Sequence, residues 1–386
     1  MFDTPTTRRR VLGQGLAAVA GLAGLGAAAR AWGEVTGEPT APPDPATLAS
    51  EVYARALPID AMATDGPFFD PKEAVAAGLT AVVADLRLYP RTFQQAVDAL
   101  AAWNDAFRRP DSNFLKVLRA ADLEEAKRLG KLGIVLACQD GSILDVATYS
   151  VNDRNLRNLR FFHELGLRVL QLTHNERNAL ADSFRERSDA GLSLLGERVV
   201  AEMNALGMLI DLSHCGDRTT LEAIRLSSKP CAVTHAGCRA LYPTGRNKTD
   251  QHLRALADRG GFFGVFSMSM WLTDRDTSSV EDVLDHIDHA VGVGGIDLVG
   301  FGSDGPVLAD DTPPEVALQG IAAYVERNAG LPGSERMPKH VAVAELNTPR
   351  RLALLAGGLA RRGYAEDAIE KVLGRNFARV FAEACG

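Results

Sequence analysis

The sequence lacks a basic stripe, and its five cysteines contain no CxxC pair. The formal net charge is −7 and the Lys and Arg residues are scattered, which argues against nucleic acid as a partner. The cysteines are odd in number and several lie in or beside apolar segments, so we expect buried thiols rather than a disulfide framework. A bridge that involves Cys215 or Cys238 remains an alternative.

The N-terminus lacks the strongly hydrophobic run that a good permanent membrane span requires. The arginines at positions 8–10 precede a stretch of mainly Ala, Gly, Leu and Val that carries no charge until Arg30. Because this pattern resembles a twin-arginine export signal, residues 1–31 are predicted to be a signal peptide, with a membrane anchor as the alternative. We expect a bacterial periplasmic or exported protein, without a stable membrane span after cleavage. The proline-rich range 32–50 is predicted to be a linker, and 51–386 the folded domain.

Apolar segments of strand length alternate with helical patterns from residue 57 onward. This alternation predicts an α/β fold, a parallel (β/α)8 barrel of the TIM type, with C-terminal helices at 349–362 and 366–384. A doubly wound open sheet is the alternative, but no glycine-rich nucleotide loop follows the first strand. The eight predicted strands are 57–62, 80–86, 133–138, 167–173, 208–213, 231–234, 262–267 and 298–303. Helices are predicted at 93–107, 121–129, 155–165, 192–206, 219–226, 249–259 and 279–291, with a further one around 316–327.

Polar side chains stand at the carboxyl ends of the predicted strands, where TIM-type barrels carry their active sites. His214 and His235 end two consecutive strands, so their imidazoles could converge on one metal ion or one substrate. Three strand-end histidines together with Asp304 favour a metal-assisted hydrolase. The residues at the eight ends are Met62 with Thr64 and Asp65, Arg87, Gln139 with Asp140, His174 with Asn175, His214, His235, Ser267 with Ser269, and Ser303 with Asp304.

For the other charged and histidine residues the sequence gives weaker evidence of a role in the site. Arg246 follows the sixth predicted strand and could bind a substrate carboxylate through its bidentate fork, or be a solvated loop charge. His286 and His289 lie three positions apart on a helical stretch, so they are expected on the helix surface or behind the site. No role is assigned to Arg87, and the remaining histidines are treated as structural: His163, His252 and His340.

Five stretches, in order along the chain, resemble the membrane (renal) dipeptidase family, a metal-dependent branch of the amidohydrolase-like barrels. They are Leu167 to Asn178, Asp211 to His214, Val233 to Ala236, Leu298 to Asp304 and Gly374 to Phe381. The resemblance implies a hydrolase that uses two zinc ions to make hydroxide and to polarise the peptide carbonyl of a dipeptide, without a covalent enzyme intermediate.

Carried onto this sequence, the resemblance implies that His214 and His235 ligate one zinc ion. It also implies that Asp304 sits by the other metal and the attacking water. His174 and Arg246 would contact the reacting carbonyl and the substrate carboxylate, and Asn175 is predicted to line the same substrate site. Asp304 and His174 are accordingly the predicted catalytic residues.

Three positions depart from the family pattern. The first strand of the family ends in H-x-D, where this chain has Met62 and Thr64, and the family's bridging glutamate is replaced by Gln139. A thioether, a hydroxyl and an amide cannot offset two dications, so we expect the binuclear centre to be absent. Asp65 or Asp140 could substitute, although strand alternation points both away from the lumen.

Two hypotheses follow. The leading one is an exported dipeptidase-family hydrolase with one zinc ion on His214, His235 and Asp304, acting on a dipeptide or a similar small amide. The alternative is a protein that binds or helps mature a peptide-derived ligand without hydrolysing it. A sugar-processing barrel would need paired carboxylates at the strand ends, and the few aspartates there do not supply them. A homodimer is compatible with either hypothesis.

Overall fold

The structure is a computed structural model that describes residues 44–86, 92–145, 153–275, 277–327 and 341–386. The predicted signal peptide, most of the predicted linker, Arg87 and His340 lie outside the described residues. Among the described residues, no helix combines the length and the apolar character that a membrane crossing needs.

The described part of the chain contains one sheet of nine strands, and every pairing between them is parallel. Eight strands follow one another in chain order, and the short β3 pairs only with β4. All eight predicted strands are confirmed, and β3 is an element that the sequence did not predict. The strands are β1 (Ile59–Ala63), β2 (Ala81–Asp85), β3 (Phe114–Lys116), β4 (Leu132–Cys138), β5 (Leu167–Gln171), β6 (Leu209–Asp211), β7 (Ala232–Ala236), β8 (Phe262–Val265) and β9 (Val299–Phe301).

The first and last strands meet just beyond β9, which nearly closes the sheet into a barrel. The backbone N–H of Asp304 donates to the carbonyl of Met62 at 2.9 Å, and that of Thr64 donates to the carbonyl of Gly305 at 3.0 Å. A parallel bridge between Ala63 and Gly305 completes this seam. The (β/α)8 prediction is therefore confirmed, and the open-sheet alternative is wrong.

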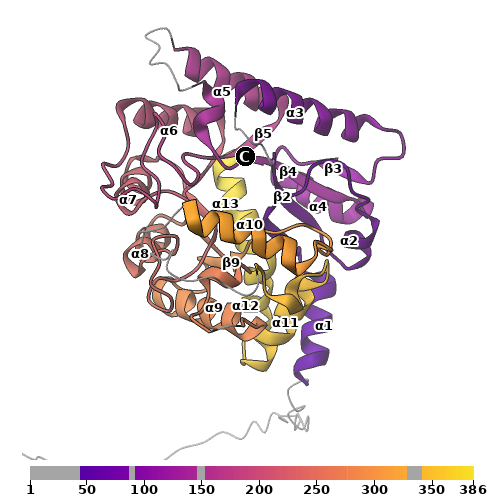
Figure 1. The fold of residues 1–386 in the computed structure, drawn as a ribbon. Coiled ribbons are helices and arrows are strands. Elements are labelled where there is room, and N and C mark those ends of the chain that lie inside the picture. Colours follow the sequence, from indigo (N-terminus) through magenta and orange to yellow (C-terminus); the bar gives the residue numbers. More distant parts are fainter. Residues whose placement is uncertain (1–43, 87–91, 146–152, 276, 328–340) are drawn as a thin grey trace, which may run out of the picture. The chain divides into compact units, whose positions relative to one another are not determined.

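Helices surround the strands (Figure 1), and each predicted helix overlaps an observed one. Helix α1 begins at Pro45, where Asp44 caps it by accepting hydrogen bonds from the N–H groups of Ala46 and Thr47. Residues 45–50 of the predicted linker are therefore helical, which corrects that boundary. The helices are α1 (Pro45–Arg55), α2 (Lys72–Ala76), α3 (Phe93–Arg108), α4 (Ala121–Leu129), α5 (Arg154–Leu165), α6 (Leu194–Leu206), α7 (Asp217–Leu226), α8 (Asp250–Asp258), α9 (Val280–Gly294), α10 (Pro314–Arg327), α11 (Arg351–Arg361), α12 (Glu366–Glu370) and α13 (Asn376–Cys385).

The last helix closes one end of the barrel. The rings of Phe377 and Phe381 on α13 pack into a buried cluster with side chains from the strands, and Phe377 meets Phe262 edge to face at 5.5 Å between ring centroids. The cluster includes the early strand residues Ile59 and Leu209, at the start of β1 and β6. The amino ends of the strands are thus sealed by apolar packing, which leaves the carboxyl ends for the site.

All five cysteines are free thiols, and four of them are buried. Burial raises the pKa of Cys215 to about 11 and that of Cys231 to about 12. These two thiols are therefore protonated at neutral pH, as expected for buried thiols. The alternative of a bridge involving Cys215 or Cys238 is wrong.

A buried ion pair holds the seam of the barrel against the C-terminal helices. Asp60 on β1 lies 3.3 Å from Arg351 on α11, and it also accepts a hydrogen bond from the N–H of Ser303 at 2.7 Å. Burial raises the pKa of Asp60, and the Arg351 guanidinium works against that rise. The pair ties β1, the segment after β9 and α11 together directly below Met62 and Asp304.

The variant Arg351→Ala should destabilise the fold by about 3 kcal/mol, because it leaves the Asp60 carboxyl buried without its cation. The matched control is Arg350→Ala, since Arg350 is the neighbouring arginine and is exposed. Its loss should stay within about 0.5 kcal/mol. Urea unfolding followed by circular dichroism measures both values. Equal, small losses in the two variants would contradict a structural role for the Asp60 pair.

Candidate metal and substrate site

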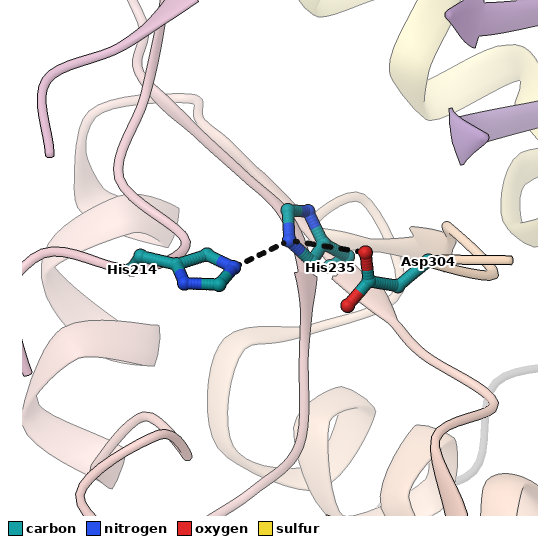
Figure 2. Close-up of side chains that lie close together, drawn as sticks. All are labelled: His214, His235 and Asp304. Carbon is teal, nitrogen blue, oxygen red and sulfur yellow. Dashed lines mark hydrogen bonds and ion pairs between the residues drawn. The ribbon is translucent and has the colours of Figure 1, made fainter. Parts of the chain in front are cut away.

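Two histidines and one aspartate converge at the carboxyl ends of the strands (Figure 2). The Nε2 atoms of His214 and His235 lie 3.1 Å apart, and Nε2 of His235 lies 3.8 Å from Oδ1 of Asp304. One ligand atom from each residue lies within 4.8 Å of the others, and within the described ranges no other group of three His, Cys, Asp or Glu side chains does so. The structure therefore brings together the three predicted metal ligands.

The orientation of the His214 ring is fixed by its neighbours. Nδ1 of His214 lies 2.9 Å from Oδ1 of Asn175, and because a carbonyl oxygen can only accept, Nδ1 carries the proton. Nε2 is then the nitrogen of His214 that faces His235, at 3.1 Å. His174 stacks on His214 with 4.4 Å between ring centroids, so His174 and Asn175 both lie beside the candidate ligands.

Asp304 occupies an unusual backbone position at the seam. Its φ of 57° lies in the left-handed region, which Asp tolerates better than most residues, and its N–H is held by Met62. Burial raises the pKa of the Asp304 carboxyl to about 7, although the Arg246 guanidinium and a hydrogen bond from Gln139 oppose the rise. Burial also moves the pKa of His235 well below its usual value, so this ring is neutral at physiological pH.

Arg246 lies behind the ligands rather than in solvent, since only 1% of its surface is exposed. Its Nη1 donates to the carbonyl of Ser213 and its Nη2 to the carbonyl of His235, both at 2.9 Å. Nη2 also lies 4.0 Å from Asp304. The guanidinium is flanked by three aromatic rings at 5.2 to 5.9 Å, those of Phe184, Phe266 and Trp271. Arg246 thus holds the backbone of the histidine-bearing segments, and the alternative of a solvated loop charge is wrong.

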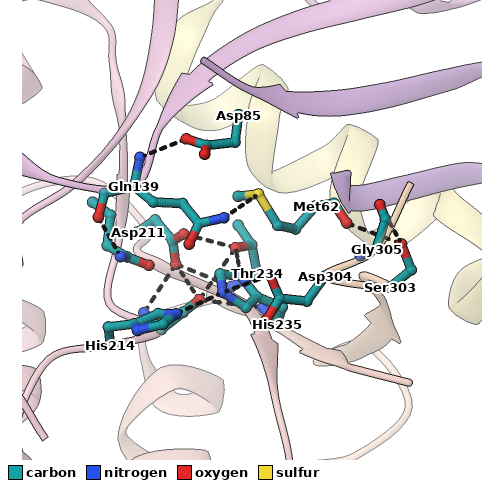
Figure 3. A network of polar contacts seen from close by, with 12 residues as sticks. Met62, Asp85, Gln139, Asp211, His214, Thr234, His235, Ser303, Asp304 and Gly305 are labelled. Atoms are coloured by element: carbon teal, nitrogen blue, oxygen red, sulfur yellow. Dashed lines mark hydrogen bonds and ion pairs between the residues drawn. The ribbon is translucent and has the colours of Figure 1, made fainter. Parts of the chain in front are cut away.

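Met62 and Gln139, two of the positions that depart from the family pattern, form a neutral pair (Figure 3). Nε2 of Gln139 donates to Sδ of Met62 at 3.3 Å, and the backbone N–H of Gln139 donates to Asp85 at 2.9 Å. Met62 therefore points toward Gln139 while Asp60 points to α11, because a register shift between Asp60 and Ala63 interrupts the alternation that the sequence predicted. Thr64 contributes its backbone to the barrel seam.

The two aspartates considered as substitute ligands serve other partners. Asp140 accepts hydrogen bonds from the N–H and hydroxyl of Ser142 and from the side chain of Asn178. Asp65 accepts a hydrogen bond from the backbone N–H of Val307. Neither joins the ligand group, so the substitution alternative is wrong for this structure.

The structure adds polar residues that the sequence argument left without a role. Asp85, Gln171 and Asp211 end β2, β5 and β6 and are buried below the candidate ligands, and Ser213 and Thr234 join them. The sequence contains a signal for two of them. Asp211 and Ser213 are two positions apart in an extended segment just before His214, so their side chains are expected to face the same side.

Three of the remaining histidines have partners of their own outside the ligand group. His286 is buried and joins Cys238 to Leu272, so its predicted place on the helix surface is wrong, and only the position behind the site fits. His289 pairs with Asp250 at 2.8 Å, and His252 forms the capping box of α8.

Comparison with known proteins agrees with this geometry. The family model described as membrane dipeptidase (peptidase family M19) matches residues 71–309. The chain belongs to the membrane dipeptidase family. It is thus a member of a dipeptidase and metallopeptidase family of hydrolases, as its motifs predicted.

Individual relatives extend the match over most of the folded domain. The dipeptidase tcpJ of Claviceps purpurea is 31% identical over 229 residues, which are 58% of this chain and 46% of that protein. The chain therefore spans about half the length of this dipeptidase relative. A crystal structure of an amidohydrolase from Pseudomonas aeruginosa is similar with a TM-score of 0.74 and 27% identity, covering 88% of this chain and 99% of that one. A metallopeptidase from Rhodobacter sphaeroides, solved with a phosphinate mimic of the dipeptide L-Ala-D-Ala, shares the fold with a TM-score of 0.65 at 19% identity, over 85% of this chain and 99% of that one.

Divalent-ion binding by this dipeptidase-family site should depend on pH through Asp304. A carboxyl with a pKa of about 7 is mostly protonated at pH 6 and mostly ionised at pH 8, and a ligand must be ionised. The zinc affinity should therefore rise about tenfold between these pH values. Competition with a chelating dye measures the affinity. Asp304→Asn should bind zinc more weakly and with a smaller pH dependence, and an unchanged pH dependence in this variant would contradict the assignment.

Proposed function

We propose that the chain is an exported hydrolase that cleaves a dipeptide, or a similar small amide, with one zinc ion held by His214, His235 and Asp304. The observation that carries the proposal is the 3.1 Å approach of the two Nε2 atoms beside a carboxylate that is only 13% exposed. Two imidazoles and one carboxylate form a donor set typical of zinc and other divalent metals, and leave coordination positions open.

The residues present fit one ion better than two. His214 and His235 supply two neutral nitrogens and Asp304 one negative charge, and Arg246 adds a positive charge 4.0 Å from Asp304. Where the family places a bridging carboxylate, Gln139 is neutral and already bonded to Met62. A second dication there would meet an amide and a thioether, which are poor ligands for zinc.

The roles of the side chains follow from their positions. A zinc ion held there supplies a Lewis acid for the peptide carbonyl and lowers the pKa of a nearby water molecule. Asp304 can accept a proton from that water, because its carboxylate lies beside the ligand nitrogens. His174 is half-buried and stacked on His214, so it can contact the reacting carbonyl. Arg246 can attract a substrate carboxylate electrostatically from behind Asp304, although both of its terminal nitrogens also donate to backbone carbonyls.

The substrate class is supported by the relatives. Several of them are named dipeptidases, and the Rhodobacter sphaeroides metallopeptidase was solved with a mimic of a dipeptide. Export is supported by the arginine pattern before the uncharged N-terminal stretch. These two features together favour a small extracytoplasmic peptide as the substrate, and a homodimer remains compatible with them.

A second function has one observation in its favour. The hydrogen bond between Gln139 and Met62 fills half of the family site with neutral groups, which suits a protein that binds a peptide-derived ligand without hydrolysing it. This alternative differs from the first in needing no metal for ligand binding.

A hydrolysis assay with controlled zinc distinguishes the two functions. The chelator-treated protein should be inactive toward a panel of dipeptides and should regain activity as zinc is added, with saturation at about one equivalent. The double variant His214→Ala, His235→Ala should lose both zinc binding and activity. A matched control is His289→Ala, because His289 is paired with Asp250 on α8 and lies outside the ligand group.

Each unexpected result of this assay contradicts one part of the proposal. Saturation at two equivalents would contradict the single-ion site, and peptide binding without turnover at any zinc level would favour the binding protein. Activity that survives in the double variant would overturn the assignment of the ligands.

A further inference from the structure

We propose that Asp211 is a positioning residue for this site, which sets the proton of the His235 ring through the hydroxyl of Thr234. The proposal rests on the proposed function in one respect, since it takes His235 to be a metal ligand. It concerns a residue that neither contacts a substrate nor ligates the ion, and that lies one layer below the ligands in the barrel lumen (Figure 3).

Asp211 is the last residue of β6 and is fully buried. Its Oδ1 accepts hydrogen bonds from the N–H and hydroxyl of Ser213 and from the N–H of Thr234, at 3.0, 2.5 and 3.1 Å. Its Oδ2 accepts the hydroxyl of Thr234 at 2.7 Å. Burial raises the pKa of Asp211, and these four hydrogen bonds oppose the rise by stabilising the ionised form. The ionised carboxylate can only accept, so all four groups point their hydrogens at Asp211.

This arrangement determines the direction of the next hydrogen bond. The hydroxyl oxygen of Thr234 lies 2.8 Å from Nδ1 of His235. Because the single hydroxyl hydrogen of Thr234 is directed to Asp211, the oxygen can only accept from the ring. Nδ1 of His235 must therefore carry the hydrogen, and Nε2 is left with its lone pair facing His214 and Asp304.

The backbone keeps Thr234 in this place. A Cβ at Gly264 or Gly302 would lie 2.0 or 2.2 Å from the carbonyl oxygen of Thr234, so only glycine allows β8 and β9 to approach so closely. The next carbonyl, that of His235, is held by Arg246 at 2.9 Å. With its main chain confined on both sides, the Thr234 hydroxyl stays between the carboxylate and the imidazole.

His214 and His235 therefore carry their ring hydrogens on the same nitrogen, Nδ1. Asn175 holds the hydrogen of His214 on Nδ1, and Thr234 with Asp211 does the same for His235. A ring with its hydrogen on Nε2 could not offer that nitrogen to a cation. Partners of this kind behind a histidine ligand raise metal affinity in general by fixing the tautomer and the ring orientation.

Two variants of the full chain test the proposal. In Asp211→Asn, the side-chain amide can donate to Thr234, whose hydroxyl would then turn to Nδ1 of His235 and shift the ring toward the tautomer protonated at Nε2. In Thr234→Val, Nδ1 of His235 loses its partner while the shape of the side chain is kept. The matched control is Thr219→Val, because Thr219 is equally buried but its hydroxyl donates to the backbone carbonyl of Asp182 and not to Asp211 or a histidine.

The readouts are the ring ¹⁵N chemical shifts in metal-free protein labelled at histidine, with His235→Ala used for assignment, and the zinc affinity by competition with a chelating dye. Wild type and Thr219→Val should show His235 protonated at Nδ1. Asp211→Asn should show a shift toward protonation at Nε2, and both site variants should bind zinc about 10- to 100-fold more weakly.

His235 protonated at Nε2 in the wild type, or wild-type tautomer and affinity in both site variants, would overturn the proposal. If Asp211→Asn does not fold, Thr234→Val decides the question by the same two readouts. If the wild type binds no zinc, the proposed function fails, whereas the tautomers of the metal-free proteins still decide the role of Asp211.

Discussion

The site depends on one constraint, which is that two buried imidazole nitrogens are held 3.1 Å apart. Two imidazole nitrogens this close need a cation between them, either a proton on one ring or a metal ion, and burial disfavours the proton on His235. With Asp304 beside them, the two nitrogens form a donor set that could hold a metal ion. The surrounding polar groups all serve to maintain this approach, from Asn175 on one ring to Thr234 on the other.

Barrel closure supplies the third ligand. Asp304 follows β9 and hydrogen-bonds through its backbone to Met62 on β1, so the position of its carboxylate depends on the seam. The seam in turn depends on Asp60 and Arg351, which are buried together below it. At this same place Met62 and Gln139 stand where the family resemblance implies a histidine and a glutamate, and the side-chain amide of Gln139 donates to the sulfur of Met62. A thioether and an amide at this place are thus compatible with an intact fold.

Most of the fold was predictable from the sequence because buried parallel strands are near-continuous apolar runs. The strand β3 was missed since its three residues, Phe114–Lys116, are too few for a periodic signal and only one of them is buried. Helix α1 was placed in the linker although Asp44 before Pro45 is a recognisable start, because the surrounding prolines favoured a linker. His286 was misplaced because sequence spacing does not reveal that α9 packs this face inward.

The candidate site was predictable in part, because its ligands stand at strand ends where the topology forces them together. His214, His235 and Asp304 were found in this way. The roles of Asp211 and Thr234 could not be found, since they depend on which atom donates each hydrogen, and this requires distances. Arg246 was noticed for its charge, but only the structure shows that it holds backbone carbonyls.

The central claim is a single-ion site, and anomalous diffraction at the zinc edge tests it most directly. Crystals of the zinc-loaded protein should give one strong anomalous peak per chain, bounded by His214, His235 and Asp304. Two peaks about 3.5 Å apart, the second beside Met62 and Gln139, would contradict the claim, as would no peak at the histidines.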